Sequence, residues 1–302
     1  MRVKTRGFAL TEGVAAGILF GTASIFIRFL QGLDAFSIAF WRLIVACLAL
    51  SAVLLFLGKS FNSRLVTENL KGLFVLSFFL ALHFIFFIFA VKDTTILNAT
   101  VLVNTTPLFS VLVSNYIFKL SPSRMAILGL AISFVGVCII AFAEAIVQSG
   151  NSRGLSPSLK GDLEAVLAAL VEALYLNYGR KIRNQMNILS IMLPIYALTA
   201  FVVLVLSLPV KSAVWTLPVN AETALLLLGL GLLPTAAAHT LYFSSLSNLK
   251  SFETATMALL EPIGATLLGV AIFQEVPAPV FALGAAMILA GIVFVGKNNS
   301  QL

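Results

Sequence analysis

The chain has 302 residues, of which 60% are hydrophobic and only 10% are charged, and its mean hydropathy is +1.06. Soluble domains carry about 25% charged residues, so this composition excludes a water-soluble protein and predicts one surrounded by membrane lipid. The net charge of +7 comes from short basic clusters between apolar runs. Such clusters are typical of membrane topology signals, so we expect no nucleic acid partner.

Ten apolar segments follow one another along the chain, and each is long enough to cross a hydrocarbon core of about 30 Å. We predict membrane spans at residues 8–30, 35–57, 71–91, 95–118, 124–146, 161–181, 187–208, 222–246, 252–273 and 278–296. The basic start of the chain resembles a signal peptide, but the apolar run after it is too long, so we expect a retained first span. The third and eighth spans run close to their successors, which leaves a nine-span arrangement as the alternative.

Basic residues are distributed unevenly between the two predicted sides of the membrane. With the N-terminus inside, the inner side holds thirteen and the outer side five: Arg2, Lys4, Arg6, Lys59, Arg64, Lys71, Lys119, Arg124, Arg180, Lys181, Arg183, Lys250 and Lys297 against Arg28, Lys92, Arg153, Lys160 and Lys211. Arg42, within the second span, completes the nineteen. Because cytoplasmic loops retain basic residues, we expect a multi-pass protein of the cell (inner) membrane with both termini cytoplasmic.

The sequence indicates an internal duplication. A polar linker at residues 148–160 separates a first half, 1–147, from a second half, 161–302, and each half contains five predicted spans. A shift of 155 residues superimposes Pro107 on Pro262, Pro122 on Pro277, Gly129 on Gly284 and Gly136 on Gly291 without a gap. Because five is odd, the second half enters the membrane inverted. We therefore predict an all-α integral membrane fold of ten transmembrane helices, arranged as two inverted five-helix repeats around a central site.

Short motifs within these spans carry a resemblance to a known family. In the first half they are Phe40-Trp41-Arg42, Asn98-Ala99-Thr100, Thr106-Pro107-Leu108-Phe109 and the pair Gly129 and Gly136. In the second half they are Ala238 to Phe243, Ala255 to Pro262, Gln274-Glu275 and the pair Gly284 and Gly291. Over nearly its whole length the chain resembles the EamA-type transporters of the drug/metabolite transporter superfamily, although Gln274-Glu275 stands where members often have Gly-Glu.

The resemblance implies a ten-helix secondary carrier of small molecules. Many members are bacterial exporters of amino acids, other metabolites or drugs, and relatives carry nucleotide sugars and sugar phosphates. It does not imply a particular substrate, and it leaves open whether the carrier is a monomer or a homodimer.

Two prolines at mid-membrane mark the first candidate positions. Pro107 and Pro262 each free a backbone carbonyl about one turn upstream, which favours a kink beside a cavity or a kink that only serves packing. Glu261 precedes the second proline and shares a helical face with Met257, so we expect both to line a substrate cavity. A buried structural partner is the alternative for Glu261.

Further polar residues within the spans are candidates for substrate binding. Glu172, with Tyr175 on the same face, is suited to hold a substrate ammonium group or to exchange a proton, and an interhelical hydrogen bond is the alternative. Thr100 and Asn104, four residues apart, offer polar recognition where lipid offers none. The full candidate set is His83, Thr100, Asn104, Glu172, Tyr175, His239, Tyr242, Met257 and Glu261.

The histidines and cysteines do not form a metal motif. Histidine as a residue type can exchange a proton near neutral pH, which makes His83 and His239 candidates for a direct role, and interhelical hydrogen bonding is the alternative for each. Cys47 and Cys138 lie alone in apolar segments, and no HExxH spacing occurs, so we expect neither a metal nor a cofactor. Arg42 lies toward the outer side, where we expect it to reach the membrane surface, and an anion-attracting vestibule is the alternative.

The motifs that are missing narrow the function. The chain has no GxxxxGK[ST] or HExxH sequence, so it is not predicted to be an ATP-driven pump or a metal-dependent enzyme of that kind. A secondary transporter that exports amino acids or related compounds, by proton exchange through Glu172 or Glu261 or by facilitated diffusion, is the first hypothesis. A sugar-phosphate or nucleotide-sugar-like carrier is second. It needs a basic residue at mid-depth, and the only Arg or Lys well inside a span, Arg42, lies toward the outer side. An intramembrane enzyme and a channel remain as alternatives.

Overall fold

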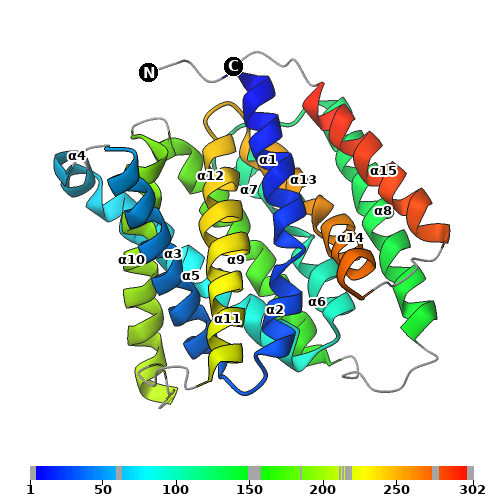
Figure 1. Ribbon diagram of the computed structural model, residues 1–302. Helices are drawn as coiled ribbons and strands as arrows, with labels where there is room; N and C mark the ends of the chain where they lie inside the picture. Colours follow the sequence, from blue (N-terminus) through cyan, green and yellow to red (C-terminus); the bar gives the residue numbers. More distant parts are fainter. Residues whose placement is uncertain are drawn as a thin grey trace.

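The computed structural model describes residues 5–58, 63–148, 158–183, 186–210, 212, 214, 220–273 and 279–297, and the secondary structure within these ranges is helical throughout (Figure 1). The helices are α1 (Arg6–Phe20), α2 (Ala23–Phe29), α3 (Ala35–Phe56), α4 (Ser63–Glu68), α5 (Leu70–Asp93), α6 (Ile96–Val103), α7 (Thr106–Tyr116), α8 (Arg124–Gln148), α9 (Leu159–Arg183), α10 (Ile188–Ser207), η1 (Leu208–Val210), α11 (Ala221–Leu230), η2 (Gly231–His239), α12 (Thr240–Ser245), α13 (Ser251–Met257), η3 (Ala258–Leu260), α14 (Glu261–Phe273) and α15 (Pro279–Gly296).

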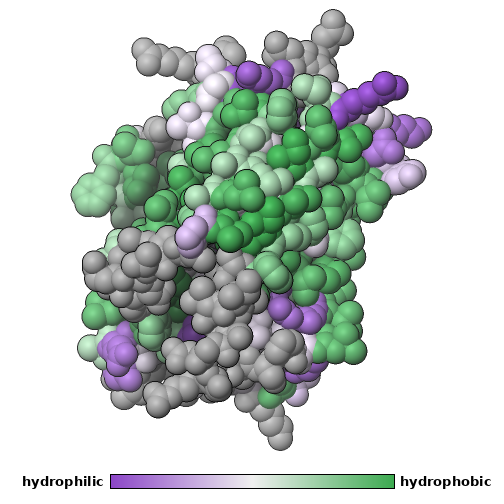
Figure 2. Space-filling view, turned by 90° about the vertical axis from the view of Figure 1, so that its right-hand side faces the viewer, coloured by the Kyte–Doolittle hydropathy of each residue, from purple (hydrophilic) through white to green (hydrophobic). Residues whose placement is uncertain are grey.

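Eight helical segments in the described residues are long and apolar enough to cross a membrane. They correspond to the first five predicted spans and to the seventh, eighth and tenth. The sixth, α9, carries more charged residues, and the ninth is divided among α13, η3 and α14. Figure 2 shows hydrophobic side chains over the middle of one face and hydrophilic ones toward its ends. The chain is therefore an all-helical, multi-pass membrane protein.

Matching caps begin the second predicted span of each half. The Asp34 carboxylate accepts hydrogen bonds from the backbone N–H groups of Phe36 and Ser37 and so starts α3. The Asn187 side chain accepts from two backbone N–H groups, those of Leu189 and Ser190, and starts α10. An Asx side chain at this position satisfies amide groups that have no partner within the helix. The two halves therefore use the same local device.

Both predicted kink residues stand where one helix ends and another begins. Pro107 has no N–H for the Val103 carbonyl, and the Thr106 hydroxyl donates to that carbonyl instead at 2.8 Å. Pro262 follows the 3₁₀ segment η3, whose Ala258 carbonyl accepts from the backbone N–H of Glu261. The fourth and ninth predicted spans are therefore interrupted helices, at the two prolines where the sequence predicted kinks.

Two other predicted spans are irregular as well. The first is divided into α1 and α2 at Gly21 and Thr22. The eighth contains the π-helical segment η2, in which Pro234 cannot donate to the Leu230 carbonyl. The Thr235 hydroxyl donates to that carbonyl at 2.7 Å, so proline and threonine together account for the wider turn.

Helices α8 and α15 lie side by side, as Figure 1 shows at one edge of the bundle. A Cβ atom on Gly136 would stand 2.6 Å from the Gly284 carbonyl oxygen, and one on Gly129 would stand 2.6 Å from that of Gly291. Between these contacts, the Ser133 hydroxyl donates to the Ile288 carbonyl at 3.2 Å. Residue numbers rise along α8 as they fall along α15, so the two helices are antiparallel.

Arg6 lies at one end of the bundle, and Lys92 and Lys160 lie at the other. Arg6 donates to the Gly296 carbonyl at 3.3 Å, which brings the start of α1 to the end of α15. At the opposite end, Lys92 donates to the Gln31 carbonyl and Lys160 forms an ion pair with Asp93. Of the predicted features, linker residues 149–157, Gln274-Glu275, Pro277 and the charges Arg2, Lys4, Lys59, Arg153 and Lys211 lie outside the described residues.

Candidate functional site

The four irregular spans meet at one cavity of about 40 Å³ in the centre of the bundle. Its lining includes residues beside each irregularity, namely Phe20 and Ala23, Val103, Asn104 and Thr106, His239, and Ala258 and Glu261. Non-helical backbone at membrane depth is tolerated where it is buried in protein or lines a cavity, and interrupted helices are typical of transporter binding sites. The backbone geometry therefore marks this cavity as the candidate site.

Arg42 lines the cavity from α3, and its side chain is only 1% exposed. Its Nε donates to the Thr235 hydroxyl at 2.8 Å, and its guanidinium lies 4.0 Å from the centre of the Phe84 ring. Its Nη1 is buried and has no hydrogen-bond partner among the described residues. The expectation that Arg42 reaches the membrane surface is wrong, because a hydroxyl and an aromatic face hold it inside the bundle.

Glu172 and His83 form the second polar element of the cavity. His83 Nδ1 lies 3.5 Å from Glu172 Oε2 and 3.1 Å from the Ala168 carbonyl oxygen. Since a carbonyl oxygen only accepts, Nδ1 carries a proton and is oriented between the two oxygens. The Thr106 hydroxyl lies 3.4 Å from the same carboxylate oxygen, at the start of α7. Helices α5, α7 and α9 thus converge on one carboxylate.

Glu261 provides a second carboxylate from the first turn of α14 and is 6% exposed. The Asn104 amide donates to its Oε2 at 3.5 Å and to the Thr100 carbonyl at 2.8 Å. Asn104, at the end of α6, therefore links the interruption in the fourth span to the interruption in the ninth.

His239 ends η2 in an aromatic surrounding. Its ring centre lies 4.8 Å from that of Phe20, 4.9 Å from that of Phe84 and 5.9 Å from that of His83. The Nδ1 atom is buried without a hydrogen-bond partner among the described residues. The two histidines, which are 156 positions apart in the sequence, therefore meet inside the cavity.

Five of the nine predicted binding residues line the cavity: His83, Asn104, Glu172, His239 and Glu261. The other four are Thr100, Tyr175, Tyr242 and Met257, and the structure does not place them on it. Thr100 instead donates to the Ile96 carbonyl within its own helix. Tyr175 packs on Phe243, with ring centres 5.4 Å apart, and Tyr242 packs on Phe20.

Met257 differs from expectation because the helix changes type after it. A 3₁₀ segment turns by about 120° per residue, so an α-helical face drawn through Met257 does not continue to Glu261. A Cβ on Gly13 would stand 2.8 Å from the Met257 side chain, which places Met257 against α1. Its role in the structure is packing between helices.

Sequence reasoning did not assign several cavity residues. Arg42 and Thr106 were visible as motif residues, and Phe84 and Phe87 as part of a phenylalanine-rich span, but nothing in the sequence paired Arg42 with Thr235. Pro234 was the available signal, because a proline inside a span predicts an irregular turn. Among the described residues, no group of three or more His, Cys, Asp or Glu side chains could hold a metal ion.

Comparison with known proteins identifies the class of the chain. The profile of the EamA-like transporter family matches twice, at residues 8–142 and 159–297. An "Uncharacterized transporter" of Archaeoglobus fulgidus is 26% identical over 97% of both chains. "Solute carrier family 35 member G1" of Mus musculus is 24% identical over 90% of this chain and 73% of its own length.

A solved crystal structure shares the fold, with a TM-score of 0.77 and 18% identity over 96% of both chains. The two profile matches together span most of the sequence, one on each side of the predicted linker. The chain therefore belongs to the EamA-like transporter family.

Proposed function

We propose that this protein is a secondary transporter that exports amino acids or related small compounds by alternating access through the central cavity. In this proposal, ten transmembrane helices form two inverted five-helix repeats, residues 1–147 and 161–302, joined by the linker 148–160 on the outer side, and both termini lie in the cytoplasm. The antiparallel packing of α8 on α15 and the contact between Arg6 and Gly296 support inversion and an even number of spans.

The charges of the cavity are the observation that carries the proposal. Arg42 presents a buried Nη1 that has no partner among the described residues, and the same cavity contains the carboxylates of Glu172 and Glu261. A guanidinium recognises a carboxylate, and a carboxylate recognises an ammonium group. A zwitterion offers both, so a compound with the amino acid head group satisfies the cavity better than one with a single charge.

Aromatic side chains complete the site. Phe20, Phe84 and Phe87 supply apolar surface beside the charged groups. A ring or aliphatic side chain of a substrate gains from burial against such a surface, by about 25 cal/mol per Å² of apolar area. We therefore expect hydrophobic amino acids to bind more tightly than small polar ones.

The size of the cavity supports alternating access. About 40 Å³ holds little more than one water molecule, whereas binding sites for small molecules enclose roughly 300–1,000 Å³. The interrupted helices have to move apart before a metabolite enters. Rocking of one repeat against the other opens such a site to each side in turn.

Proton exchange through Glu172 or Glu261 is the proposed driving reaction. A buried carboxylate that binds a substrate ammonium group in one state and a proton in the other couples the two fluxes. Glu172 is the stronger candidate of the two, because the imidazole of His83 lies 3.5 Å from its Oε2 atom and presents an N–H group there.

A sugar-phosphate or nucleotide-sugar-like substrate is the second candidate, and Arg42 favours it. The sequence-based reason for ranking it lower was the lack of a basic residue at mid-depth, and the buried position of Arg42 overturns that reason. Two carboxylates in the same cavity still repel a dianion, so this substrate class stays second.

The test is counterflow into liposomes that contain the purified protein. Labelled amino acids are compared with their N-acetyl derivatives, with the corresponding amines, and with sugar phosphates. We expect only compounds with both charges to exchange, with flux that saturates, as a carrier requires and a channel does not. The absence of counterflow with every amino acid would overturn the proposed substrate class.

Two variants test the coupling. Glu172→Gln or Glu261→Gln is expected to abolish pH-driven flux, and Glu68→Gln, at an exposed carboxylate paired with Arg64, is the matched control. Wild-type pH-driven flux in both cavity variants would eliminate the proton-exchange assignment.

A further inference from the structure

We propose that two polar latches, one at each end of the bundle, act as the gates of the cavity, and that the Arg6–Glu253 ion pair closes the end where α1 begins. The terminal latch consists of Arg6, Glu253 and the carbonyls of Asn248 and Gly296. The distal latch consists of Asp162, Thr94 and Asn98. The inference rests on the proposed function, because gates have meaning only where access alternates.

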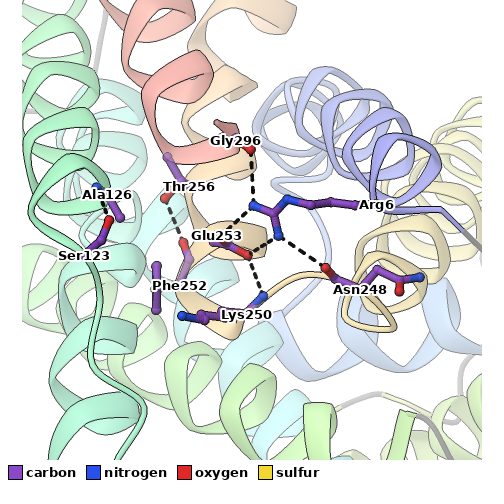
Figure 3. A network of polar contacts seen from close by, with 9 residues as sticks. All are labelled: Arg6, Ser123, Ala126, Asn248, Lys250, Phe252, Glu253, Thr256 and Gly296. Carbon is purple, nitrogen blue, oxygen red and sulfur yellow. Dashed lines mark hydrogen bonds and ion pairs between the residues drawn. The ribbon is translucent and has the colours of Figure 1, made fainter. Parts of the chain in front are cut away.

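The terminal latch is a bidentate ion pair, drawn in Figure 3. Arg6 Nη2 lies 2.8 Å from Glu253 Oε1 and Arg6 Nη1 lies 3.1 Å from Oε2. The guanidinium also donates to the Asn248 carbonyl at 3.4 Å and to the Gly296 carbonyl at 3.3 Å. One side chain therefore ties the start of α1 to the start of α13 and the end of α15.

The Glu253 carboxylate is held in place by its own helix as well as by Arg6. Its side chain is only 1% exposed, whereas that of Arg6 is 28% exposed. The backbone N–H of Lys250 donates to Glu253 Oε2 at 2.8 Å, so the carboxylate is oriented by its own helix. Opening this end thus requires Arg6, at the edge, to leave a carboxylate that stays in place.

The distal latch ties the start of α9 to the other half. Asp162 Oδ1 accepts from the Thr94 hydroxyl at 2.9 Å and from the Asn98 amide at 3.1 Å. The same amide lies 3.2 Å from Oδ2. Thr94 follows the end of α5 and Asn98 belongs to the first turn of α6, so this contact also joins the two halves.

The two latches occupy equivalent positions in the duplicated sequence. The shift of 155 places Asn98 on Glu253, and it places Arg6 one residue before Asp162. In each case the first helix of one half is bonded to the fourth predicted span of the other half. Because the halves are inverted, equivalent contacts lie at opposite ends, and a rocking motion can break one while it keeps the other.

The two latches differ in strength, so one end of the cavity opens more readily than the other. The terminal latch joins two full charges in a bidentate geometry, whereas the distal latch joins a carboxylate to neutral donors. Charge-assisted pairs of opposite ions are the stronger kind. The distal end also has the Lys160–Asp93 ion pair, but the Lys160 side chain is 71% exposed, and an exposed pair contributes little. The resting protein therefore opens more readily at the distal end, and loss of the Glu253 charge reverses the preference.

The test measures access to the cavity from each side and needs no substrate, so it can fail or succeed independently of the amino acid assay. Cys47 and Cys138 are replaced by alanine, and Ala23→Cys places one thiol on the cavity lining. A membrane-impermeant maleimide is added from one side of proteoliposomes at a time. Gly7→Cys and Gly32→Cys, at positions with no neighbour within 4 Å, report which side is which.

We expect substitutions in the two latches to increase labelling of the cavity thiol from opposite sides of the membrane. Glu253→Gln raises labelling of the cavity thiol from the terminal side by about tenfold, and Asp162→Asn raises labelling from the distal side. Arg6→Gln, which breaks the same ion pair and leaves the contact between Glu253 and the Lys250 N–H in place, raises labelling from the terminal side in the same way. The matched control Arg64→Gln, which removes an exposed ion pair with Glu68, leaves the pattern unchanged.

A contact that only stabilises the fold gives a different result. Equal changes from both sides, or none, in variants that melt like the parent would overturn the proposal. If Glu253→Gln does not fold, Arg6→Gln takes its place, because it breaks the ion pair and keeps the contact between Glu253 and the Lys250 N–H. An Arg6→Gln protein that melts and labels like the parent also overturns the gate assignment.

Discussion

The packing of α8 on α15 and the lining of the cavity use the duplicated sequence in opposite ways. Along α8 and α15 both halves keep the same glycines, and the contacts between them are reciprocal: Gly129 meets Gly291 and Gly136 meets Gly284. Around the cavity equivalent positions differ, since Thr106 corresponds to Glu261 and Gly17 corresponds to Glu172. Symmetry is kept where helices only pack, and it is lost where charge is placed.

The α8–α15 contact and the cavity are therefore constrained in different ways. The α8–α15 contact has no space for a side chain at its glycines, so its constraint is steric and applies equally to both halves. The cavity has polar atoms that find no hydrogen-bond partner in the described part of the chain, and such atoms cost stability and are retained where they serve a function. Substitutions in the first region should change folding, and those in the second should change transport.

The largest effect is expected from a bulky residue in the glycine contact. Gly136→Leu places a side chain where even a Cβ would stand 2.6 Å from the Gly284 carbonyl oxygen, so α8 and α15 have to separate. We expect the free energy of unfolding to fall by about 3 kcal/mol or more, because overpacking of a closed contact forces backbone shifts. The melting temperature and yield of the purified protein in detergent measure this.

Gly296→Ala, also in α15, is the matched control, because its nearest neighbour to a new Cβ is a Leu10 side-chain carbon at 3.6 Å. It should melt like the parent. A Gly136→Leu protein that melts with the parent would show that the helix pair is not a rigid contact.

Substitution of Arg42 should affect transport without a comparable effect on folding. Arg42→Gln removes a charged donor that faces the cavity, and such hydrogen bonds contribute about 1.5–3 kcal/mol, so we expect the apparent affinity for a zwitterion to fall about 10- to 100-fold. Arg42→Lys keeps the charge but loses the bidentate geometry, and it should retain part of the affinity. Counterflow kinetics measure both.

The matching amine provides the control for Arg42. Because it has no carboxylate, any weak exchange of this compound should be the same in the parent and in Arg42→Gln. Equal losses for the zwitterion and for the amine would mean that Arg42 shapes the cavity and does not bind the substrate carboxylate.

Much of the fold could be predicted because its causes are local. The apolar runs, the Asx caps at Asp34 and Asn187, and the glycines of α8 and α15 are each visible within a few residues. The interruptions at Pro107 and Pro262 were signalled in the same way, although the sequence did not show that the helices stop there. Local chemistry determines where a helix begins more clearly than how it continues.

The candidate site was less accessible to sequence reasoning because it depends on distant pairs. Glu172 and Glu261 are notable as charges within spans, and both line the cavity. Arg42 was placed by its depth along one helix, whereas its environment is set by Thr235, 193 residues later. Met257 was placed by a helical face that the 3₁₀ turn of η3 interrupts.

A smaller effect is expected from removing the proline of η2. Pro234→Ala restores the N–H that a regular helix would donate to the Leu230 carbonyl, so Thr235 no longer has to satisfy it. We expect higher stability, because an internal proline disfavours a helix, and an affinity lower by roughly tenfold as the support of Arg42 shifts. Melting and counterflow should therefore move in opposite directions. If both fall, the wide turn serves only packing.

The smallest effect is expected from removing the helix caps. Asp34 caps α3 in the first half with a charged side chain, whereas Asn187 caps α10 in the second half with a neutral one. Burial raises the pKa of the Asp34 carboxyl, but hydrogen bonds from the Ser212 and Ser37 side chains and from two backbone N–H groups outweigh it, so the pKa lies below its ordinary value. Asp34→Ala and Asn187→Ala should each lower stability by about 1 kcal/mol at neutral pH, as the loss of a cap does.

Lowering the pH distinguishes these two variants. A depressed carboxyl pKa means that the contribution of Asp34 is complete above about pH 4 and is lost as the pH falls through the lowered pKa. The difference in melting temperature between the parent and Asp34→Ala should therefore shrink in acid, whereas the difference for Asn187→Ala should not. A constant Asp34 difference down to pH 2 would mean that the cap acts through its shape and not through its charge.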